Sequence, residues 1–288
     1  MPEGHSVHRL ARSLHRSFAG EPVRVSSPQG RFAEDAAALD GRVLARAEAW
    51  GKHLFLLFRE DLVVHVHLGL YGDFLRARTP VPEARGAVRL RLEGARWYAD
   101  LRGPTACDLL GPEGRAAILA RLGPDPLRRD ADPAVVRRRI TASRSPVAGL
   151  LMDQSVLSGV GNIYRAELLY RHEVSPFTEG RALPGETVDA MWADLVLLMR
   201  DGVRRGRIVT VAPEDVARLA ALDVDRPAAD DPDLDGGEAT PARRRLRRST
   251  GVYVYRREGR ACLRCGSLVR VEDYQGRRLF WCPGCQTR

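Results

Sequence analysis

Lysine is almost absent from this chain of 288 residues. Lysine and arginine together number 46, and Lys52 is the single lysine among them. Codon bias in a GC-rich genome explains the many arginines, but it does not explain the one lysine that remains. A lysine amine can give up its proton near neutral pH, whereas a guanidinium cannot. We therefore expect Lys52 to stand where arginine would not serve.

Long apolar runs are also missing from the sequence. No stretch approaches the roughly 18 to 20 apolar residues that span a bilayer, and the first residues lack the features of a secretory signal. We expect a cytoplasmic protein with no membrane partner. Hydrophobic residues make up 44% of the chain, which is typical of a globular protein, and its formal net charge is +9. The positive charge indicates a polyanionic partner, because neutralising phosphates releases counterions.

Cysteines are few, and four of the five stand near the end of the chain in two close pairs. The lone Cys107 is expected to be a small buried apolar residue. Two CxxC pairs are typical of a closed, structural zinc site rather than of disulfides. The paired residues are Cys262, Cys265, Cys282 and Cys285. Residues 269–274 and 277–281 have strand character around Gln275-Gly276, so we expect a zinc-stapled β-hairpin with Arg277 at its tip.

The hydrophobic pattern divides the rest of the chain. Apolar residues recur at helical spacing over residues 7–18, and alternation from about residue 22 to 110 predicts a β-sandwich. A turn-rich segment precedes Asp132-Pro133, which is typical of a helix start, and helical patterns continue to residue 207. Residues 223–250 are rich in Asp, Pro and Ala, so we expect a flexible loop, with a DNA-contacting basic tail as the alternative. These patterns predict an α+β fold.

Two short segments carry possible chemistry. Residues 150–167 predict a helix, a Gly-rich turn and a second helix that begins at Asn162, where exposed amides would suit a phosphate. An ordinary helical hairpin is the alternative. At the other end, trimming of Met1 would leave Pro2 with a free secondary amine beside Glu3. An α-amine titrates at about 7.7 to 8.0, against about 10.4 for lysine, so the Pro2 amine could attack a sugar carbon.

Taken in order along the chain, these pieces resemble the formamidopyrimidine-DNA glycosylase and endonuclease VIII family. The pair Leu70-Tyr71 and the overall spacing are most similar to the endonuclease VIII branch as found in actinobacteria. The matching segments are residues 1–4, 50–54, 67–72 and 121–125, the turn and helix around Asn162, and the paired cysteines. The resemblance implies an α+β protein with an N-terminal helix, a β-sandwich, a helix-two-turn-helix domain and a C-terminal zinc-finger hairpin. The expected segments are a catalytic domain at 1–122, a linker at 123–132, the helical domain at 133–222, the flexible loop at 223–250 and the zinc finger at 251–288.

The resemblance also implies a function. It implies a bifunctional DNA glycosylase and abasic-site lyase that removes oxidised bases from double-stranded DNA and nicks the strand by β,δ-elimination in base excision repair. Oxidised pyrimidines are the favoured substrate, with oxidised purines as the alternative. We expect a monomer near the bacterial nucleoid that carries one structural zinc ion. The implied roles are Pro2 as Schiff-base nucleophile, Glu3 as general acid or base, Lys52 and Arg277 as phosphate ligands that assist elimination, His67, Arg121 and Asn162 as backbone contacts, and Leu70 and Tyr71 as a wedge in the base stack.

Two positions depart from the family pattern. His5 and Ser6 stand where family members usually carry a second glutamate, and Gly69 stands where endonuclease VIII relatives often have an amide. A DNA-binding damage sensor without catalysis is the rival interpretation. The joint presence of Pro2, Glu3 and Lys52 argues against it, because a pure binder needs no imine-forming amine.

Overall fold

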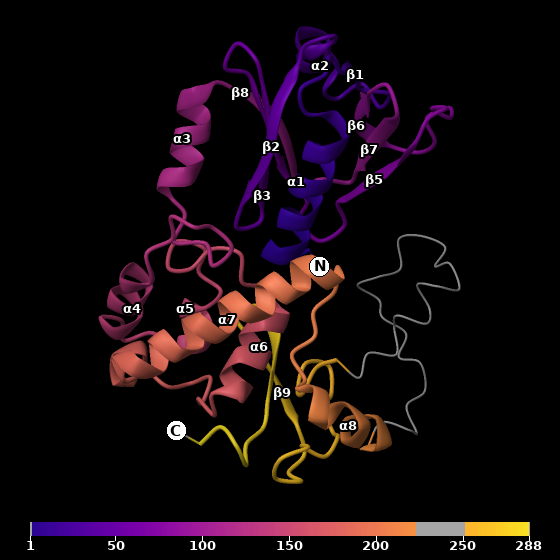
Figure 1. Cartoon of the computed structure of the whole chain (residues 1–288). Coiled ribbons are helices and arrows are strands. Elements are labelled where there is room, and N and C mark those ends of the chain that lie inside the picture. Colours follow the sequence, from indigo (N-terminus) through magenta and orange to yellow (C-terminus); the bar gives the residue numbers. More distant parts are fainter. Residues whose placement is uncertain (1, 223–250, 288) are drawn as a thin grey trace. The chain divides into compact units, whose positions relative to one another are not determined.

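A computed structural model describes residues 2–222 and 251–287 of the chain (Figure 1). Its contacts divide the chain into two units, Met1–Leu122 and Gly123–Arg288. The expected flexible loop at 223–250 lies outside the described residues. Among the helices that the structure does describe, none combines the length and the apolar composition that crossing a bilayer requires.

The first unit is a β-sandwich with an opening helix, as the sequence predicts. Helix α1 (Gly4–Phe18) buries residues at helical spacing, among them Val7, Leu14 and Phe18. Two antiparallel four-stranded sheets follow, in the orders β1-β6-β7-β5 and β2-β3-β4-β8. Their strands are β1 (Arg24–Ser26), β2 (Leu44–Trp50), β3 (His53–Phe58), β4 (Val63–His67), β5 (Asp73–Arg78), β6 (Val88–Glu93), β7 (Trp97–Arg102) and β8 (Ala106–Leu110).

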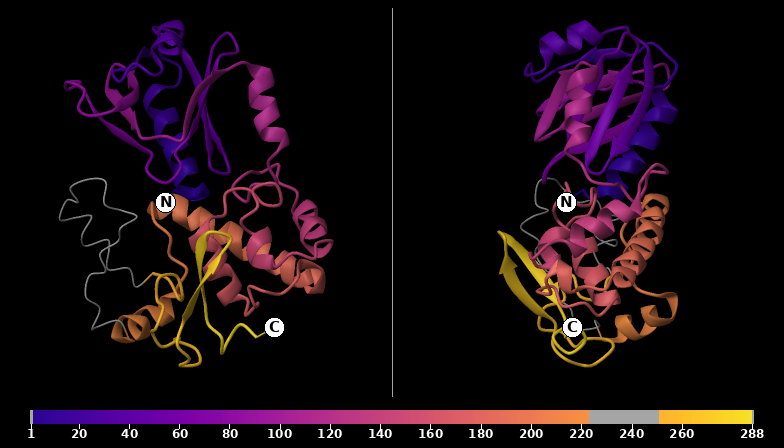
Figure 2. Two further views of the ribbon diagram at one scale, coloured as in Figure 1. Left: turned by 180° about the vertical axis from the view of Figure 1, so that it is seen from behind. Right: turned by 90° about the vertical axis from the view of Figure 1, so that its left-hand side faces the viewer.

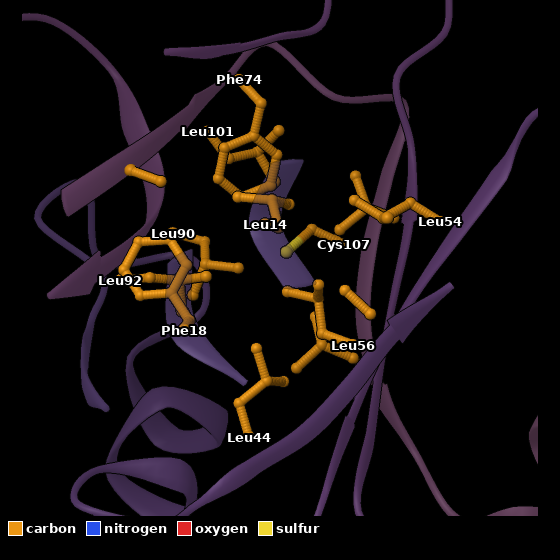
Figure 3. Packing of buried hydrophobic residues seen from close by; sticks show 14 of the residues in the cluster. Leu14, Phe18, Leu44, Leu54, Leu56, Phe74, Leu90, Leu92, Leu101 and Cys107 are labelled. Atoms are coloured by element: carbon orange, nitrogen blue, oxygen red, sulfur yellow. The ribbon is translucent and has the colours of Figure 1, made fainter. Parts of the chain in front are cut away.

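Alternation along these strands builds the core of the first unit. Leu90 and Leu101 of one sheet and Leu54 of the other belong to one buried cluster, together with Leu14 of α1 (Figure 3). Cys107 joins the same cluster and is only 7% exposed, so the expectation that it is a small buried apolar residue is confirmed. Burial of such side chains is the main favourable term in folding.

Two helices of this unit were not anticipated from the sequence. Helix α2 (Ala33–Leu39) is short, and α3 (Pro112–Ala120) contains no buried residue. A helix without a buried face has no hydrophobic periodicity, which is why the pattern at α3 did not indicate one. Helix α3 follows β8 in the chain (Figure 1). It contacts β4 and β8, and its Arg115 forms an ion pair with Glu48 of β2.

The second unit joins helices to a C-terminal hairpin. The α-helices are α4 (Pro133–Thr141), α5 (Val147–Leu150), α6 (Asn162–Arg171), α7 (Gly185–Arg205) and α8 (Val216–Leu222), with single 3-10 turns η1 (Gly180–Ala182) and η2 (Pro213–Asp215). Asp132 begins α4 as expected, because its Oδ1 accepts a hydrogen bond of 2.9 Å from the amide of Ala134. The buried face of α7 includes Val188, Leu195 and Met199, whereas Trp192 is only partly buried.

The hairpin consists of β9 (Arg270–Tyr274) and β10 (Arg277–Trp281) and is drawn as the yellow strands in Figure 2. Gln275 and Gly276 between them both have positive φ, as a two-residue hairpin turn requires. Leu279 packs into the cluster of helices α4 to α7, and Phe280 packs into a second cluster around Tyr170. The strand therefore belongs to the core of the unit, and the predicted α+β fold class is confirmed.

A buried carboxylate ties helix α6 to the segment that leads to the hairpin. Glu167 is fully buried, and its two oxygens accept hydrogen bonds of 2.7 to 2.8 Å from the amides of Tyr253, Val254 and Tyr255. The Thr210 hydroxyl donates to the same carboxylate. A buried charge is tolerated only when donors surround it in this way.

We predict that Glu167→Gln destabilises the second unit by about 2 to 4 kcal/mol, because the amide nitrogen would face backbone N–H groups and the charge would be lost. Chemical unfolding followed by circular dichroism measures the loss. Glu186→Gln, at an exposed position in the first turn of α7, is the matched control and should cost about 0.5 kcal/mol or less. Equal unfolding free energies for the two variants would contradict the prediction.

Candidate active site and metal centre

Pro2 and Glu3 lie at the beginning of helix α1. Glu3 occupies the N-cap position with extended backbone and is 1% exposed, and Pro2 before it is partly buried. The Glu3 carbonyl accepts hydrogen bonds of 2.9 Å and 2.8 Å from the amide and hydroxyl of Ser6. The positive end of the helix dipole therefore lies beside the Glu3 side chain and the amine-bearing residue before it.

His5 is buried where relatives are expected to carry a second carboxylate. Burial, together with the neighbouring His8, lowers the pKa of His5 to about 4. The imidazole is therefore neutral near physiological pH, and it can exchange a proton only at a cost. The hydroxyl of Ser6 is already used on the Glu3 carbonyl. Neither residue supplies a second anionic group beside Glu3.

Lys52 lies in the tight turn between β2 and β3, directly before His53. In the register of β3 and β4, His53 is paired with His67, and their rings are 5.0 Å apart. Burial lowers the pKa of His53 to about 3, and the basic groups around it add to that shift. These groups are His65, His67, Arg121 and Lys52. The structure thus brings Lys52, His67 and Arg121 together around one neutral imidazole.

Leu70 and Tyr71 protrude from the turn between β4 and β5. Their exposed fractions are 48% and 72%, which is high for apolar side chains. Gly69 before them has φ +67°, and a Cβ at this position would lie 1.9 Å from Thr105 Oγ1. A side chain at residue 69 would clash with Thr105 and would strain the backbone. This explains why the chain has glycine here and lacks the amide side chain that endonuclease VIII relatives often carry.

Asn162 begins α6, but its side chain is directed toward the hairpin. Its Nδ2 donates to the carbonyl of Arg278 over 2.9 Å, and its Oδ1 accepts from Arg165. Asn162 is only 9% exposed. This contact fixes β10 at Arg278, the residue directly after Arg277. Arg277 itself is exposed at the hairpin tip. The sequence did not anticipate the contact, because residues 162 and 278 meet only through tertiary packing.

The four paired cysteines form one cluster. Their sulfur atoms all lie within 4.8 Å of one another, with 3.7 Å between Cys262 and Cys285 and 3.4 Å between Cys265 and Cys282. A tetrahedral zinc site with Zn–S bonds of about 2.3 Å has sulfurs about 3.8 Å apart. The cysteines are not joined as disulfides. The donor set and its spacing therefore fit a structural metal ion.

Side chains that the sequence did not single out support this cluster. The Tyr170 hydroxyl lies 3.2 Å from Cys262 Sγ, and Gln286 accepts a 2.7 Å hydrogen bond from the Cys282 amide. A hydrogen bond from Ser267 lowers the pKa of the Cys265 thiol to about 6. Such partners orient metal ligands and adjust their charge. The sequence pattern of α6 indicates that Tyr170 is buried, but it does not indicate the contact with Cys262, which depends on tertiary packing.

Two domain models of one protein family match this chain. The formamidopyrimidine-DNA glycosylase N-terminal domain matches residues 1–107, and the formamidopyrimidine-DNA glycosylase H2TH domain matches residues 122–213. The chain is 50% identical over 291 residues to Endonuclease 8 1 of Mycobacterium tuberculosis, covering 100% of both chains. It belongs to the formamidopyrimidine-DNA glycosylase and endonuclease VIII family. This is a family of DNA repair glycosylases, as the sequence resemblance implied.

More distant relatives agree with this family membership. Endonuclease 8 of Escherichia coli is 28% identical over 296 residues, covering 99% of this chain and 100% of the relative. Among solved structures, the Lactococcus lactis formamidopyrimidine-DNA glycosylase bound to DNA with an abasic site matches with a TM-score of 0.75. That match has 18% identity and covers 99% of this chain and 100% of the other. It shows the fold.

We predict one zinc ion per folded chain, bound by the four cysteines. Cys282→Ser should lose the metal and raise amide exchange over residues 270–281, because Cys282 directly follows β10. Elemental analysis and exchange mass spectrometry measure the two effects. Cys107→Ala, which changes the cysteine outside the cluster, should keep the metal. Folded wild-type protein without zinc would disprove the prediction.

Proposed function

We propose that this chain is a bifunctional DNA glycosylase and abasic-site lyase that acts on oxidised bases in double-stranded DNA, with pyrimidines favoured. One observation carries the proposal: Pro2 directly precedes the buried Glu3 at the start of α1. An amine and a carboxylate at this place form the pair that imine chemistry needs. The 50% identity to a protein named Endonuclease 8 1 over the full length supports the same interpretation.

The first step is base removal. Once Met1 has been trimmed, the secondary amine of Pro2 attacks C1′ of the deoxyribose. The glycosidic bond breaks, its electron pair leaves with the base, and the base takes up a proton. The amine nitrogen loses its proton, the C1′–O4′ bond of the sugar ring then breaks, and O4′ takes up a proton. The product is a ring-opened iminium ion between Pro2 and C1′. Glu3 is the acid or base for these proton transfers, since a buried carboxyl can hold or release a proton beside the reacting atoms.

Strand cleavage follows by elimination. Loss of a proton from C2′ allows the 3′ phosphate to leave with its bonding electrons, and a second elimination releases the 5′ phosphate. Lys52 binds a phosphate and donates a proton in the first elimination, together with the backbone contacts of His67 and Arg121. Their grouping around His53 supports a phosphate site in the first unit. In the second unit, Arg277 is proposed as a phosphate ligand that assists the final elimination.

DNA engagement requires that the damaged nucleotide leave the stack. Flipping costs a few kcal/mol, and least for damaged bases, which contributes to selectivity. The exposed Leu70 and Tyr71 are proposed to fill the vacated space. The side chain of Asn162 already donates a hydrogen bond to the carbonyl of Arg278. A phosphate contact by Asn162 would therefore use the second hydrogen of its side-chain amide, or the backbone N–H groups at the start of α6. We propose that the protein works as a monomer with one structural zinc in the bacterial cytoplasm, near the nucleoid.

We predict that borohydride traps a covalent adduct between Pro2 and a lesion-containing duplex, because it reduces an iminium to a stable amine. Lys52 is the only lysine in the chain. It is therefore the only side-chain amine that could form the adduct in place of Pro2, and the single variant Lys52→Ala tests it. Blocking the N-terminus with an uncleaved tag should abolish trapping. Lys52→Ala should slow strand cleavage by about 10² to 10⁴-fold yet still form adducts. The measurement is gel electrophoresis of the cross-linked product.

Glu3→Gln separates base removal from cleavage in the same assay. It should slow excision of an oxidised base far more than cleavage of a preformed abasic site, where no base has to leave. Undiminished trapping by the blocked protein, with loss of trapping in Lys52→Ala, would assign the nucleophile to Lys52. No adduct and no cleavage with any duplex would favour a DNA-binding protein without catalysis.

We also predict that Arg277→Ala weakens duplex binding and lowers the salt dependence of log K by about 0.9, the contribution of one phosphate contact. Arg270→Ala is the matched control, because Arg270 is exposed on the same hairpin but pairs with Trp281 at the opposite end. Fluorescence anisotropy over a range of salt concentrations gives both slopes. Identical slopes for wild type and Arg277→Ala would show that the hairpin tip does not touch the backbone.

A further inference from the structure

A row of imidazoles lies on the outer face of the β2-β3-β4-β8 sheet. Leu54 and Leu56 of β3 and Val66 of β4 point into the core, so the alternate positions His53, His65 and His67 share the opposite face. Helix α3 contacts β4 and β8, which belong to this sheet. The two histidines at 53 and 65 have no assigned part in the proposed chemistry.

Two of these imidazoles are connected to a carboxylate. His65 is paired with Asp108 in the register of β4 and β8, and its Nδ1 lies 3.5 Å from Asp108 Oδ2. Its other nitrogen, Nε2, lies 2.9 Å from His53 Nδ1. The rings of His53 and His65 are stacked, with centroids 5.2 Å apart. Asp108, His65 and His53 therefore form a continuous chain of polar contacts.

The direction of this chain follows from its carboxylate end. Asp108 can only accept, so His65 donates from Nδ1–H, and the neutral ring then accepts at Nε2. His53 must donate from Nδ1–H to His65, which leaves its own Nε2 with a lone pair. The contact with His65 uses only Nδ1 of His53. The chain ends on a proton acceptor in the residue next to Lys52.

Burial is the main reason that this acceptor is unprotonated, and the ionisable groups that face His53 and its neighbour His65 add to that effect or, in the case of Asp108, oppose it. They are Lys52 in the β2–β3 turn, His65 and His67 on β4, Asp108 on β8 and Arg121 after α3. The nearby Arg115 of α3 forms an ion pair with Glu48 of β2, which also pairs with Arg46. Burial and the positive groups lower the pKa of all three histidines. A bound phosphate would bring a negative charge to the same place and reverse the electrostatic part of that shift.

We propose that His53 takes up a proton from solvent when a DNA phosphate binds beside Lys52. His65 and Asp108 are positioning residues that hold the ring of His53 and stabilise the added charge through the hydrogen-bonded chain. Phosphate binding and protonation then favour each other, because linkage between two binding events is reciprocal. The inference rests on the proposed function, since the phosphate belongs to the bound duplex.

Affinity for the duplex should decrease as the pH rises. In the free protein the pKa of His53 is about 3, below the ordinary value of 6.5, and in the complex it is higher. The complex therefore holds more protons than the separate partners between the two values. Affinity is fully present below the lower pKa and declines as pH rises through the higher one. The slope of log Kd against pH equals the protons taken up, at most about one.

The test uses the full chain and a duplex with a tetrahydrofuran abasic analogue, which has no aldehyde and forms no imine. Kd is measured by fluorescence anisotropy from about pH 5.5 to about pH 8, the range in which histidine charge changes. Calorimetry in two buffers with different ionisation heats counts the protons directly. The variants are His65→Gln and Asp108→Asn, and the second changes a half-exposed side chain that should not affect folding. His15→Gln is the control, because His15 is exposed on α1.

We expect proton uptake by wild type and His15→Gln, and a loss of about half of it or more in both chain variants. Contributions from Pro2 and Glu3 are common to all four proteins and cancel in the comparison. Tight binding with the same slope in wild type, His65→Gln and Asp108→Asn would overturn the inference and leave the proposed function standing. Absence of duplex binding by wild type would overturn the proposed function and the inference with it.

Discussion

A buried carboxylate must be surrounded by hydrogen-bond donors, and this constraint organises the second unit. Glu167 finds its donors in three successive backbone amides, Tyr253 to Tyr255, and so fixes where the chain approaches helix α6. The same helix contacts the hairpin through Asn162 and the cysteine cluster through Tyr170. One helix thereby positions the metal ligands and the strand that carries Arg277. The side chains of Asn162, Glu167 and Tyr170 on α6 therefore hold the second unit together.

In the first unit the corresponding constraint is electrostatic. The cations Lys52 and Arg121 lie around His53 together with two further imidazoles, and burial keeps the imidazoles neutral. Neutral rings avoid the repulsion that three imidazolium ions beside Lys52 and Arg121 would create. The arrangement is most favourable when an anion balances the remaining cations. A phosphate does this, whereas a neutral ligand would not, so the local charge favours a polyanion independently of the family resemblance.

The sequence predicted those parts of the fold that depend on local pattern. Alternation and turn residues indicated the sandwich and the hairpin, and the spacing of the cysteines indicated their cluster. The sequence did not predict helix α3, because this helix has no buried face and therefore no apolar periodicity. The chain from Asp108 through His65 to His53 could not be found either, because it depends on the register of three strands. Composition indicated Lys52 and the family resemblance indicated His67, but only the structure identified His53 and His65 beside them.

The single lysine can now be understood from its surroundings. An arginine at residue 52 would keep the positive charge beside His67 and Arg121, so phosphate attraction alone does not require lysine. A guanidinium, however, holds its proton at every accessible pH and spreads its charge over a planar fork, whereas an ammonium is a compact donor that can release a proton. In the proposed mechanism, Lys52 makes such a transfer to the phosphate that leaves during elimination. Lysine therefore supplies a property that the many arginines of this chain lack, and the tight turn at Gly51 and Lys52 holds it beside its cationic neighbours.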